Sequence, residues 1–353
     1  MKICLIGEFA VPDEARKVMA TQLLRTLSQD HTVEVLNLAK WASVEEWRRI
    51  KRFAPDIIHY IPGASTFSFL FTRALQAYLG NDAKTVTFSA LNTLPGFSGF
   101  SYGPYYALSW LTKGAIPFIK TDLVLVQSDN AEQTYRALRC KVKYAVYSGV
   151  DLERFRPIAE NDKQELKREY GIDPEKFVVL HVGSVRKWRN VSHLTDIQKA
   201  SDTQVVLVGR ATTKNEKDVE QALRRTGMVV MDGYDPNIEK FYGLADCYVF
   251  PTTTAVGSID VPLSVLEAMA HNLPVISTRF GGLPRMFGEG NGFFYSDTAN
   301  LAQRVQTVKE AGATVATRQL VTPYSWKKIA NNLCAIYGEL LKGTSPDNRR
   351  QSQ

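Results

Sequence analysis

The clearest chemical pattern in the chain lies in residues 260–278, DVPLSVLEAMAHNLPVIST. The pattern predicts a turn, a short helix and a buried strand, with the carboxylates of Asp260 and Glu267 near the helix start. A helix N-terminus carries partial positive charge, so an acidic pair beside it suits a ligand with both hydroxyl groups and phosphates. Ser264 and Glu267 also fit a capping box, in which both side chains satisfy free N–H groups of the first turn. The sequence alone leaves the ligand-binding and capping interpretations of Glu267 open.

Alternating strands and helices must position these residues. Apolar runs predict strands at 3–7, 33–38, 56–60, 85–88, 123–127 and 143–147, and again at 177–183, 204–209, 228–232, 247–250 and 274–278. Helix-like segments between them include 14–27, 44–53, 130–138, 215–226 and 298–310. This alternation indicates parallel sheets covered on both faces. We therefore predict an α/β fold with two Rossmann-like, doubly wound domains. Such sheets bind ligands at the carboxyl ends of their strands, so we expect the site in a central cleft that both domains face.

The predicted domain boundary lies after Tyr147, where a Gly turn leads into Pro157 and a charged stretch. Such a composition is typical of a connection between domains. We place the first domain at residues 1–150 and the second at 151–324. Residues 343–353 hold no apolar face and are predicted to be a disordered tail.

Composition excludes several classes of protein. The 353 residues are 44% hydrophobic and 22% charged, which is ordinary for a globular chain and excludes a disordered or fibrous one. We interpret the start, MKICLIGEFA, as a buried strand rather than a secretory signal, and no run of about 18 apolar residues predicts a membrane span. The four isolated cysteines favour reduced thiols in a cytosolic protein. The net charge of +7 is compatible with phosphate-rich partners, although the basic runs at 48–52 and 349–350 are interpreted as solvated helix faces.

Besides residues 260–278, several other segments of the chain match the sequence motifs of one protein family. These are SGVDLERFRP at 148–157, HVGS at 181–184, ADCYVFP at 245–251, and the ending from YSW at 324–326 to Tyr337. Together they resemble the family 4 retaining glycosyltransferases. The resemblance implies the GT-B architecture, in which a C-terminal helix, here residues 325–342, crosses back onto the first domain.

The resemblance assigns roles to the donor side. Glu267 matches the second Glu of the family signature, which holds the ribose of the donor nucleotide. The first Glu would fall at Ile259, so we expect Asp260 to contact the donor sugar hydroxyls, the alternative being a loop Asp bonded to its own backbone. The other donor-binding candidates are Gly183, Ser184, Gly209, Leu263, Ser264, Gly281 and Gly282.

Cationic side chains are expected to neutralise the donor diphosphate. No Asp-x-Asp pair exists in the chain, so we expect neither a metal nor a cofactor, the nucleotide-sugar being a substrate. Fixed Arg and Lys side chains supply the charge instead. The family has an Arg and, five residues later, a Lys where this chain has Ser184 and Arg189. We expect Arg189 first and Arg186 second to be catalytic together with Asp260, and Lys187 to be solvated. Arg285 replaces the family's Glu after the Gly-Gly loop.

The first domain departs further from the family. Its loop after the first strand reads Gly7-Glu8, and the His that often follows the fourth strand corresponds to Ser89. We expect Gly7, Glu8, Ser89 and Asn92, with the aromatic-rich loop 95–106, to shape the acceptor side. His59, at the end of a predicted strand, is interpreted as structural.

The leading hypothesis is a metal-independent, retaining glycosyltransferase that moves a hexose from a UDP- or GDP-linked donor to a lipid-linked or cell-surface glycan precursor. Two alternatives stay open. The altered first-domain loop favours a non-catalytic nucleotide-sugar-binding subunit, whereas the scattered histidines disfavour a nucleotide-sugar 2-epimerase. We expect no nucleic-acid partner. A cytoplasmic location is expected, and the basic charge is compatible with a peripheral contact on an anionic inner membrane face.

Overall fold

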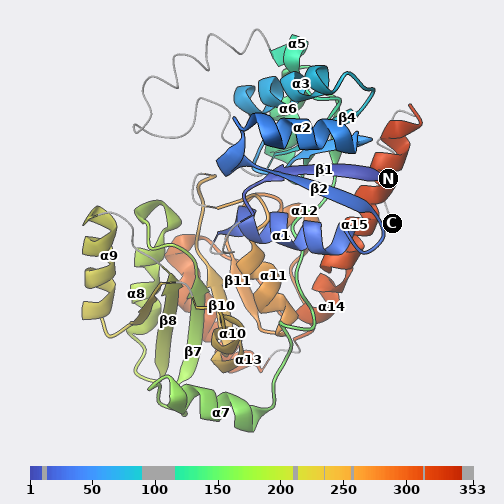
Figure 1. Ribbon diagram of the computed structural model, residues 1–353. Helices are drawn as coiled ribbons and strands as arrows, with labels where there is room; N and C mark the ends of the chain where they lie inside the picture. The colour runs from blue at the N-terminus through green and yellow to red at the C-terminus, as the bar shows by residue number, and fades with distance from the viewer. Residues whose placement is uncertain are drawn as a thin grey trace. The chain divides into compact units, whose positions relative to one another are not determined.

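The computed structural model describes residues 1–9, 14–89, 116–209, 214–233, 235–255, 258–312 and 315–343. The chain divides into two compact units (Figure 1): unit 1 comprises Met1–Ser148 and Trp326–Gln353, and unit 2 comprises Gly149–Ser325. Each unit holds a six-stranded sheet. Of the predicted disordered tail, residues 344–353 lie outside the described part of the chain.

The sheet of unit 1 is parallel throughout, with strand order β2-β1-β3-β4-β5-β6. Its strands are β1 (Lys2–Gly7), β2 (Thr32–Asn37), β3 (Ile57–Tyr60), β4 (Lys84–Phe88), β5 (Leu123–Val126) and β6 (Val142–Tyr144). Its helices are α1 (Ala15–Leu27), η1 (Leu38–Lys40), α2 (Val44–Phe53), α3 (Thr66–Leu79), α5 (Ile116–Ile119), α6 (Asp129–Ala137) and α15 (Trp326–Leu341). Figure 1 shows α2 and α3 over one face and α1, which packs along α15, over the other. The central strands are buried on both faces, which explains their near-continuous apolar sequences.

The sheet of unit 2 is also parallel, with strand order β12-β11-β10-β7-β8-β9. Its strands are β7 (Phe177–Val182), β8 (Thr203–Gly209), β9 (Val229–Asp232), β10 (Cys247–Phe250), β11 (Val275–Ser277) and β12 (Phe293–Tyr295). Its longer helices are α7 (Glu160–Glu169), α9 (Lys214–Arg225), α11 (Leu263–Ala270) and α13 (Leu301–Ala311); the shorter ones are η3 (Lys187–Arg189), η4 (Val191–His193), α8 (Leu194–Gln198), α10 (Glu239–Leu244), α12 (Leu283–Met286), η5 (Thr298–Asn300), α14 (Thr317–Val321) and η6 (Thr322–Tyr324). The strand order reverses between β7 and β10, the first and fourth strands of this sheet. In doubly wound sheets this reversal is the switch point beyond which ligands bind.

The predicted α/β class with two doubly wound sheets is confirmed by these strand orders. Strand β12 was not predicted from the sequence. Only three residues long, it lies between Gly292 and Ser296, and a run this short carries no periodic signal. It pairs with β11 and so completes one edge of the sheet.

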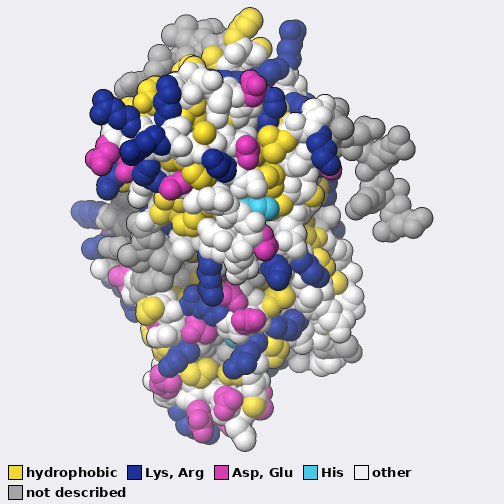
Figure 2. Space-filling model, turned by 45° about the vertical axis from the view of Figure 1, so that its right-hand side comes forward, with side chains coloured by type: hydrophobic (Ala, Val, Ile, Leu, Met, Phe, Trp, Pro, Cys, Tyr) yellow, Lys and Arg dark blue, Asp and Glu magenta, His cyan; other side chains and the backbone are white. Residues whose placement is uncertain are grey.

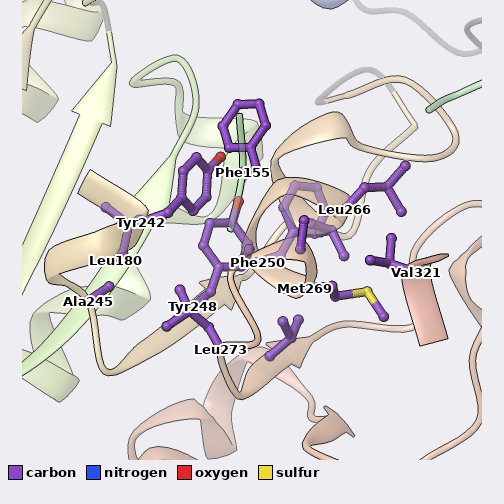
Figure 3. Packing of buried hydrophobic residues seen from close by; sticks show 14 of the residues in the cluster. Phe155, Leu180, Tyr242, Ala245, Tyr248, Phe250, Leu266, Met269, Leu273 and Val321 are labelled. Carbon is purple, nitrogen blue, oxygen red and sulfur yellow. The ribbon is translucent and has the colours of Figure 1, made fainter. Parts of the chain in front are cut away.

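The core of unit 2 beneath α11 is rich in aromatic side chains. Tyr242, Tyr248 and Phe250 lie beside Leu266 and Met269 (Figure 3), and all five are buried. Ser264 and Glu267 are the half-buried members of α11, and the helix is otherwise buried all round. Because they are three positions apart, they lie on one face of the helix. The packing of α11 therefore directs its two polar side chains to the same place.

A buried ion cluster ties α7 to the sheet. Asp246, just before β10, accepts hydrogen bonds from Lys167 Nζ at 2.9 Å, Lys163 Nζ at 3.0 Å and the Val178 N–H at 2.8 Å. Lys167 is 3% exposed, so its charge depends on this carboxylate and on two backbone carbonyls. We expect Asp246→Ala to lower the free energy of unfolding by about 3–5 kcal/mol, because it leaves a buried ammonium without its counter-ion.

Urea unfolding of the whole chain measures this loss. The matched control is Glu169→Ala, which removes the exposed ion pair with Lys240 and should cost about 0–1 kcal/mol. Equal losses in the two variants would contradict the expectation.

Candidate functional site

The candidate site lies where the strand order of unit 2 reverses. The loops that follow β7 and β10 meet there, and Gly209 ends the neighbouring strand β8. Asn190 ties the two loops together, because its Nδ2 donates to the Pro251 carbonyl at 3.0 Å and to Thr253 Oγ1 at 2.8 Å. Asn190 can do this because it adopts a left-handed conformation, with φ of 58°, which Asn tolerates better than most residues.

Two glycines bring the backbone and a cation unusually close together. A Cβ atom at Gly209 would lie 1.8 Å from the carbonyl oxygen of Gly183, and a Cβ atom at Gly183 would lie 2.0 Å from Nη1 of Arg189. The guanidinium of Arg189 therefore folds back over the end of β7. Donor binding by both glycines stays a prediction; in the structure they admit this close packing.

Three polar atoms at this edge are buried without a hydrogen-bond partner among the described residues: His181 Nε2, Arg189 Nε and Thr252 Oγ1. His181 bonds the Val249 carbonyl through Nδ1 at 2.9 Å. Since a carbonyl can only accept, Nδ1 carries the proton and Nε2 is an acceptor. Burial, and then the charge of Arg189, lowers the pKa of His181 to about 4, so the ring is neutral near pH 7.

The surroundings of Arg189 disfavour the charged form of its guanidinium. Burial lowers the pKa of this guanidinium to about 10, with a further lowering by Arg186. Buried polar groups in folded proteins nearly always have partners. Arg189 is half-buried, but its Nε is buried without such a partner beside other unpartnered polar atoms, which indicates a place for an anionic ligand.

The N-terminus of α11 does not have the predicted capping box. Its N-cap is Pro262, which makes no side-chain cap, and Ser264 lies inside the helix. Ser264 Oγ instead accepts a hydrogen bond from Tyr248 at 2.8 Å, and Glu267 Oε2 accepts one from Tyr242 at 2.6 Å. The capping interpretation, one of the two left open by the sequence, is therefore wrong, because both side chains turn to tyrosines on neighbouring elements rather than back to the helix end.

The first backbone N–H groups of α11 consequently have no side-chain cap. No described residue accepts a hydrogen bond from the backbone N–H groups of Leu263 and Ser264. Free N–H groups and the helix dipole together make such an end a binding place for anions. Leu263 itself is buried, so we expect its backbone rather than its side chain to meet a ligand.

Two tyrosines connect the predicted residues. Tyr248 lies close enough to Arg189 for each to shift the other's pKa, and it also bonds Ser264. Tyr242 bonds Glu267, and the two tyrosine rings are 6.0 Å apart. Burial raises the pKa of Glu267, while the Tyr242 hydrogen bond lowers it. The structure thus brings Arg189, Ser264 and Glu267 into one cluster. Neither tyrosine was predicted from the sequence, although Tyr248 stands within the ADCYVFP segment.

Asp260 lies between β10 and α11, beside the Gly281-Gly282 loop that follows β11. It is buried, and its carbonyl accepts the Gly282 N–H at 2.8 Å. A Cβ atom at Gly281 would lie 2.1 Å from this carbonyl oxygen, and Gly281 has a left-handed φ of 55°. The Gly-Gly loop therefore holds the backbone of Asp260 just ahead of α11. Arg285 is exposed nearby in sequence.

Arg186 is engaged differently from Arg189. Its Nε lies 3.2 Å from a carboxylate oxygen of Glu216 in α9, and its guanidinium lies over the ring of Trp188. Lys187 is exposed, and Ser184 is half-buried. Of the basic loop, Arg189 is thus the residue directed at the edge of the sheet.

The predicted acceptor residues of unit 1 lie at the carboxyl edge of its sheet. Gly7 ends β1 and is buried, whereas Glu8 is exposed. Ser89 follows β4 and is fully buried, and its hydroxyl has no partner among the described residues. His59 bonds Tyr337 of α15 through Nδ1, and burial lowers its pKa to about 3. Asn92 and the loop 95–106 lie outside the described residues.

The close approach of Gly209 to Gly183 carries a prediction. We expect Gly209→Ala to lower the free energy of unfolding by about 1–3 kcal/mol, because the added methyl group meets backbone that must shift. The shift displaces Gly183, against which the guanidinium of Arg189 packs. The folded protein should therefore bind nucleotide more weakly. Thermal melts with and without UDP measure both effects.

The control for Gly209→Ala is Gly338→Ala within α15. A Cβ atom there meets nothing within 4 Å, and alanine favours a helix interior by roughly 0.5–1 kcal/mol. The two substitutions should therefore change stability in opposite directions. A neutral Gly209→Ala would show that the strand ends are not packed as described.

Two features are absent from the described residues. None of their helices is long and apolar enough to cross a membrane. Within the same ranges, no group of three or more His, Cys, Asp or Glu side chains is placed to hold a metal ion.

Parts of the chain are similar in sequence to known proteins. Residues 162–330 match the family model described as glycosyl transferases group 1. The chain is 26% identical over 302 residues to a sulfoquinovosyl transferase of Arabidopsis thaliana, covering 79% of this chain but only 55% of that protein. It is 25% identical over 363 residues to an alpha-maltose-1-phosphate synthase of Mycobacterium tuberculosis, covering 94% of this chain and 87% of the other.

A solved structure shows the same fold. The Anabaena protein HepE, in complex with UDP and glucose, superposes with a TM-score of 0.72 at 16% identity, over 96% of this chain and all of the other. With two parallel sheets of doubly wound order, the fold is GT-B. The match over residues 162–330, the relatives and the fold agree in what this chain is similar to: the group 1 glycosyl transferases.

Proposed function

We propose that this protein transfers a sugar from a nucleotide-sugar to a hydroxyl acceptor, with retention of configuration at the anomeric carbon. One observation carries the proposal. At the switch point of unit 2, Arg189, whose Nε is buried, and the free N–H groups at the start of α11 lie near Glu267, a carboxylate on α11. A nucleoside diphosphate matches this arrangement. Its anionic phosphates suit the cation and the N–H groups, and the two hydroxyl groups of its ribose suit the carboxylate.

The donor is placed as follows in this proposal. Glu267 accepts hydrogen bonds from the ribose hydroxyls, and the diphosphate lies against Arg189 and the N-terminus of α11. The sugar reaches the Gly281-Gly282 loop, where Asp260 binds its hydroxyl groups. Arg186 adds positive charge at longer range while it remains paired with Glu216. We propose UDP or GDP as the nucleotide, and the HepE complex with UDP makes UDP the first candidate.

The transfer step needs stabilisation of one developing charge. The bond between the anomeric carbon and the phosphate oxygen breaks, and the departing diphosphate gains a negative charge that Arg189 and the α11 N–H groups stabilise. The acceptor oxygen forms its bond to the anomeric carbon on the same face. Its proton passes to the departing phosphate oxygen, so no other base is required.

The acceptor in this proposal is a hydroxyl group of a lipid-linked or cell-surface glycan precursor, bound on the side of Gly7, Glu8 and Ser89. We propose that the protein acts in the cytoplasm, with a peripheral contact on an anionic membrane. The relatives named above act on different compounds, so the acceptor has to be found by experiment.

A two-step experiment tests the proposal. Thermal melts with UDP, GDP and their common sugar conjugates should show stabilisation by one nucleotide series, because a ligand that binds only the folded state raises its melting temperature. Radiolabelled donors of that series, with water and a panel of glycan and lipid-linked acceptors, should then give a transferred or hydrolysed sugar. Stabilisation without turnover would indicate a non-catalytic binding subunit instead. No stabilisation by any of the nucleotides would remove the proposal altogether.

A further inference from the structure

The solvent face of α3 in unit 1 is apolar. Its exposed residues are Phe67, Leu70, Ala74, Ala77 and Tyr78, which recur at helical spacing along one side. Phe67 and Leu70 are 50% and 49% exposed. The single charged residue of α3, Arg73, is turned away to Asp122 and to the Lys120 carbonyl. A surface helix normally shows the reverse pattern, with its apolar side inward and its polar side in water.

Aromatic side chains extend this apolar stripe towards α2. Trp41 is 48% exposed and meets the edge of Phe67 at 6.1 Å between ring centroids. Phe67 stacks on Phe71, which contacts Trp47, and Trp47 contacts Tyr78. The contacts form a continuous aromatic chain between the two helices. Contiguous exposed apolar surface of this kind marks an interaction site rather than scattered surface residues.

The solvent face of α2 next to this stripe is basic. Arg48, Lys51 and Arg52 are all exposed, and none of them forms an ion pair within the described part of the chain. Lys51 lies over the ring of Tyr78, which places a cation directly at the edge of the stripe. Arg49, in contrast, is turned to Glu34 and Glu46. In the upper part of Figure 2, which is unit 1, Lys and Arg side chains are set among hydrophobic ones.

We propose that this face, the apolar stripe of α3 with the basic face of α2, binds the surface of an anionic lipid bilayer. Phe67, Leu70 and Trp41 enter the boundary between headgroups and acyl chains, where apolar and amphipathic aromatic side chains are stabilised. Arg48, Lys51 and Arg52 meet the lipid phosphates. Phe118, which is 87% exposed on α5 beside α3, adds to the inserted surface.

The positive charge of α2 favours an anionic bilayer over a second copy of the chain as the partner of this surface. In a two-fold dimer the same patch faces itself, so the unpaired cations of α2 would lie beside their own symmetry mates. Such like-charge contacts are unfavourable, whereas an anionic bilayer supplies a counter-charge to each cation. The combination of a basic helix face and an apolar stripe therefore fits a lipid surface better than another copy.

Binding of the full chain to vesicles tests this inference without any donor, acceptor or turnover. Sedimentation with vesicles of phosphatidylcholine alone and with about one third phosphatidylglycerol should show binding to the anionic vesicles only. The triple variant Arg48→Gln, Lys51→Gln, Arg52→Gln should bind on the order of 100-fold more weakly, since each cation near an anionic surface contributes about a fivefold factor.

A charge-matched control separates this surface from net charge. The variant Lys217→Gln, Arg224→Gln, Arg225→Gln removes three exposed cations from α9 of unit 2 and should leave vesicle binding within about twofold of wild type, as expected for cations that are not part of the α2 and α3 surface. If the two triple variants bind equally well, or if wild type does not bind anionic vesicles, the inference is wrong.

Two further measurements test insertion of the stripe. Leu70→Ser should weaken binding roughly tenfold without changing the melting temperature, because the side chain is half exposed in the free protein. Lipids brominated near the headgroup should quench tryptophan fluorescence in wild type and much less in Trp41→Phe. Self-association that Leu70→Ser abolishes, with no vesicle binding, would assign the surface to a second copy instead. A protein that binds vesicles but no nucleotide would leave this inference standing while removing the proposed function.

Discussion

Replacing Arg189 with alanine is expected to lower kcat by about 100- to 1000-fold, the range seen when a single group that stabilises transition-state charge is removed. The guanidinium lies over Gly183 at the carboxyl edge of the sheet and has no hydrogen-bond partner at Nε among the described residues. In the proposed reaction it faces the diphosphate as negative charge develops there. Its loss should therefore affect the chemical step more than the fold.

The free Arg189→Ala protein should be at least as stable as wild type. Burial lowers the pKa of this guanidinium to about 10, which means that the folded protein disfavours its charged form relative to the unfolded chain. Removing the side chain removes that cost, and a stability gain at a functional position is a known trade-off. Thermal melts should show this together with a lost response to UDP.

Lys187→Ala is the matched control, since it removes an exposed cation from the same loop. Arg189→Lys keeps a charge but loses the planar fork, and it should restore only part of the rate. Full activity of Arg189→Ala with every accepted donor would remove this residue from the site.

Replacing Glu267 with alanine is expected to weaken nucleotide binding by about 100-fold, because two charge-assisted hydrogen bonds to the ribose, each worth about 1.5 kcal/mol, are lost. Glu267→Gln should lose nearly as much binding, although its amide oxygen still accepts the Tyr242 hydrogen bond. The alanine variant should also be less stable than the glutamine variant, since it leaves the buried Tyr242 hydroxyl without this acceptor. Calorimetric titration with UDP or GDP measures the affinity.

The pH dependence of nucleotide binding distinguishes a binding carboxylate from a structural one. Burial raises the pKa of Glu267, so binding should weaken as the pH falls through that raised pKa and the carboxylate takes up a proton. The Tyr242 hydrogen bond lowers the same pKa, so Tyr242→Phe should move the midpoint to higher pH. Glu267→Gln should have no such midpoint. A midpoint that Tyr242→Phe leaves unchanged would assign the titration to another group.

Two groups of charged residues in unit 2 differ in how far the protein itself supplies their partners. Lys167 and Lys163 share the carboxylate of Asp246, and both ends of the contact are satisfied by the protein itself. Arg189 is half-buried, yet its Nε and polar atoms around it are buried without hydrogen-bond partners among the described residues. The cluster around Asp246 holds α7 on the sheet, whereas the surroundings of Arg189 are suited to binding a ligand.

Most of the fold could be predicted from the sequence because strand and helix signals are local. The buried strand at 247–250 and the helix at 44–53 were predicted with the bounds that the structure shows, since continuous apolar runs and helical spacing are properties of neighbouring residues. The short strand β12 was missed because three residues are too few for a period. The choice of Arg189 and Glu267 came from their places after a strand and on a helix of the family pattern.

The sequence by itself determined the alternation of strands and helices, and hence two doubly wound sheets, together with the segments that supply the candidate site. Only the tertiary structure decided which partners the polar residues take. Ser264 bonds a tyrosine 16 residues away and Glu267 one 25 residues away, so no local motif could distinguish these bonds from a cap. The division of roles between Arg186 and Arg189 and the outward apolar face of α3 were decided in the same way. Periodicity reports which residues avoid water, whereas hydrogen bonds and exposed surfaces depend on which elements pack together in three dimensions.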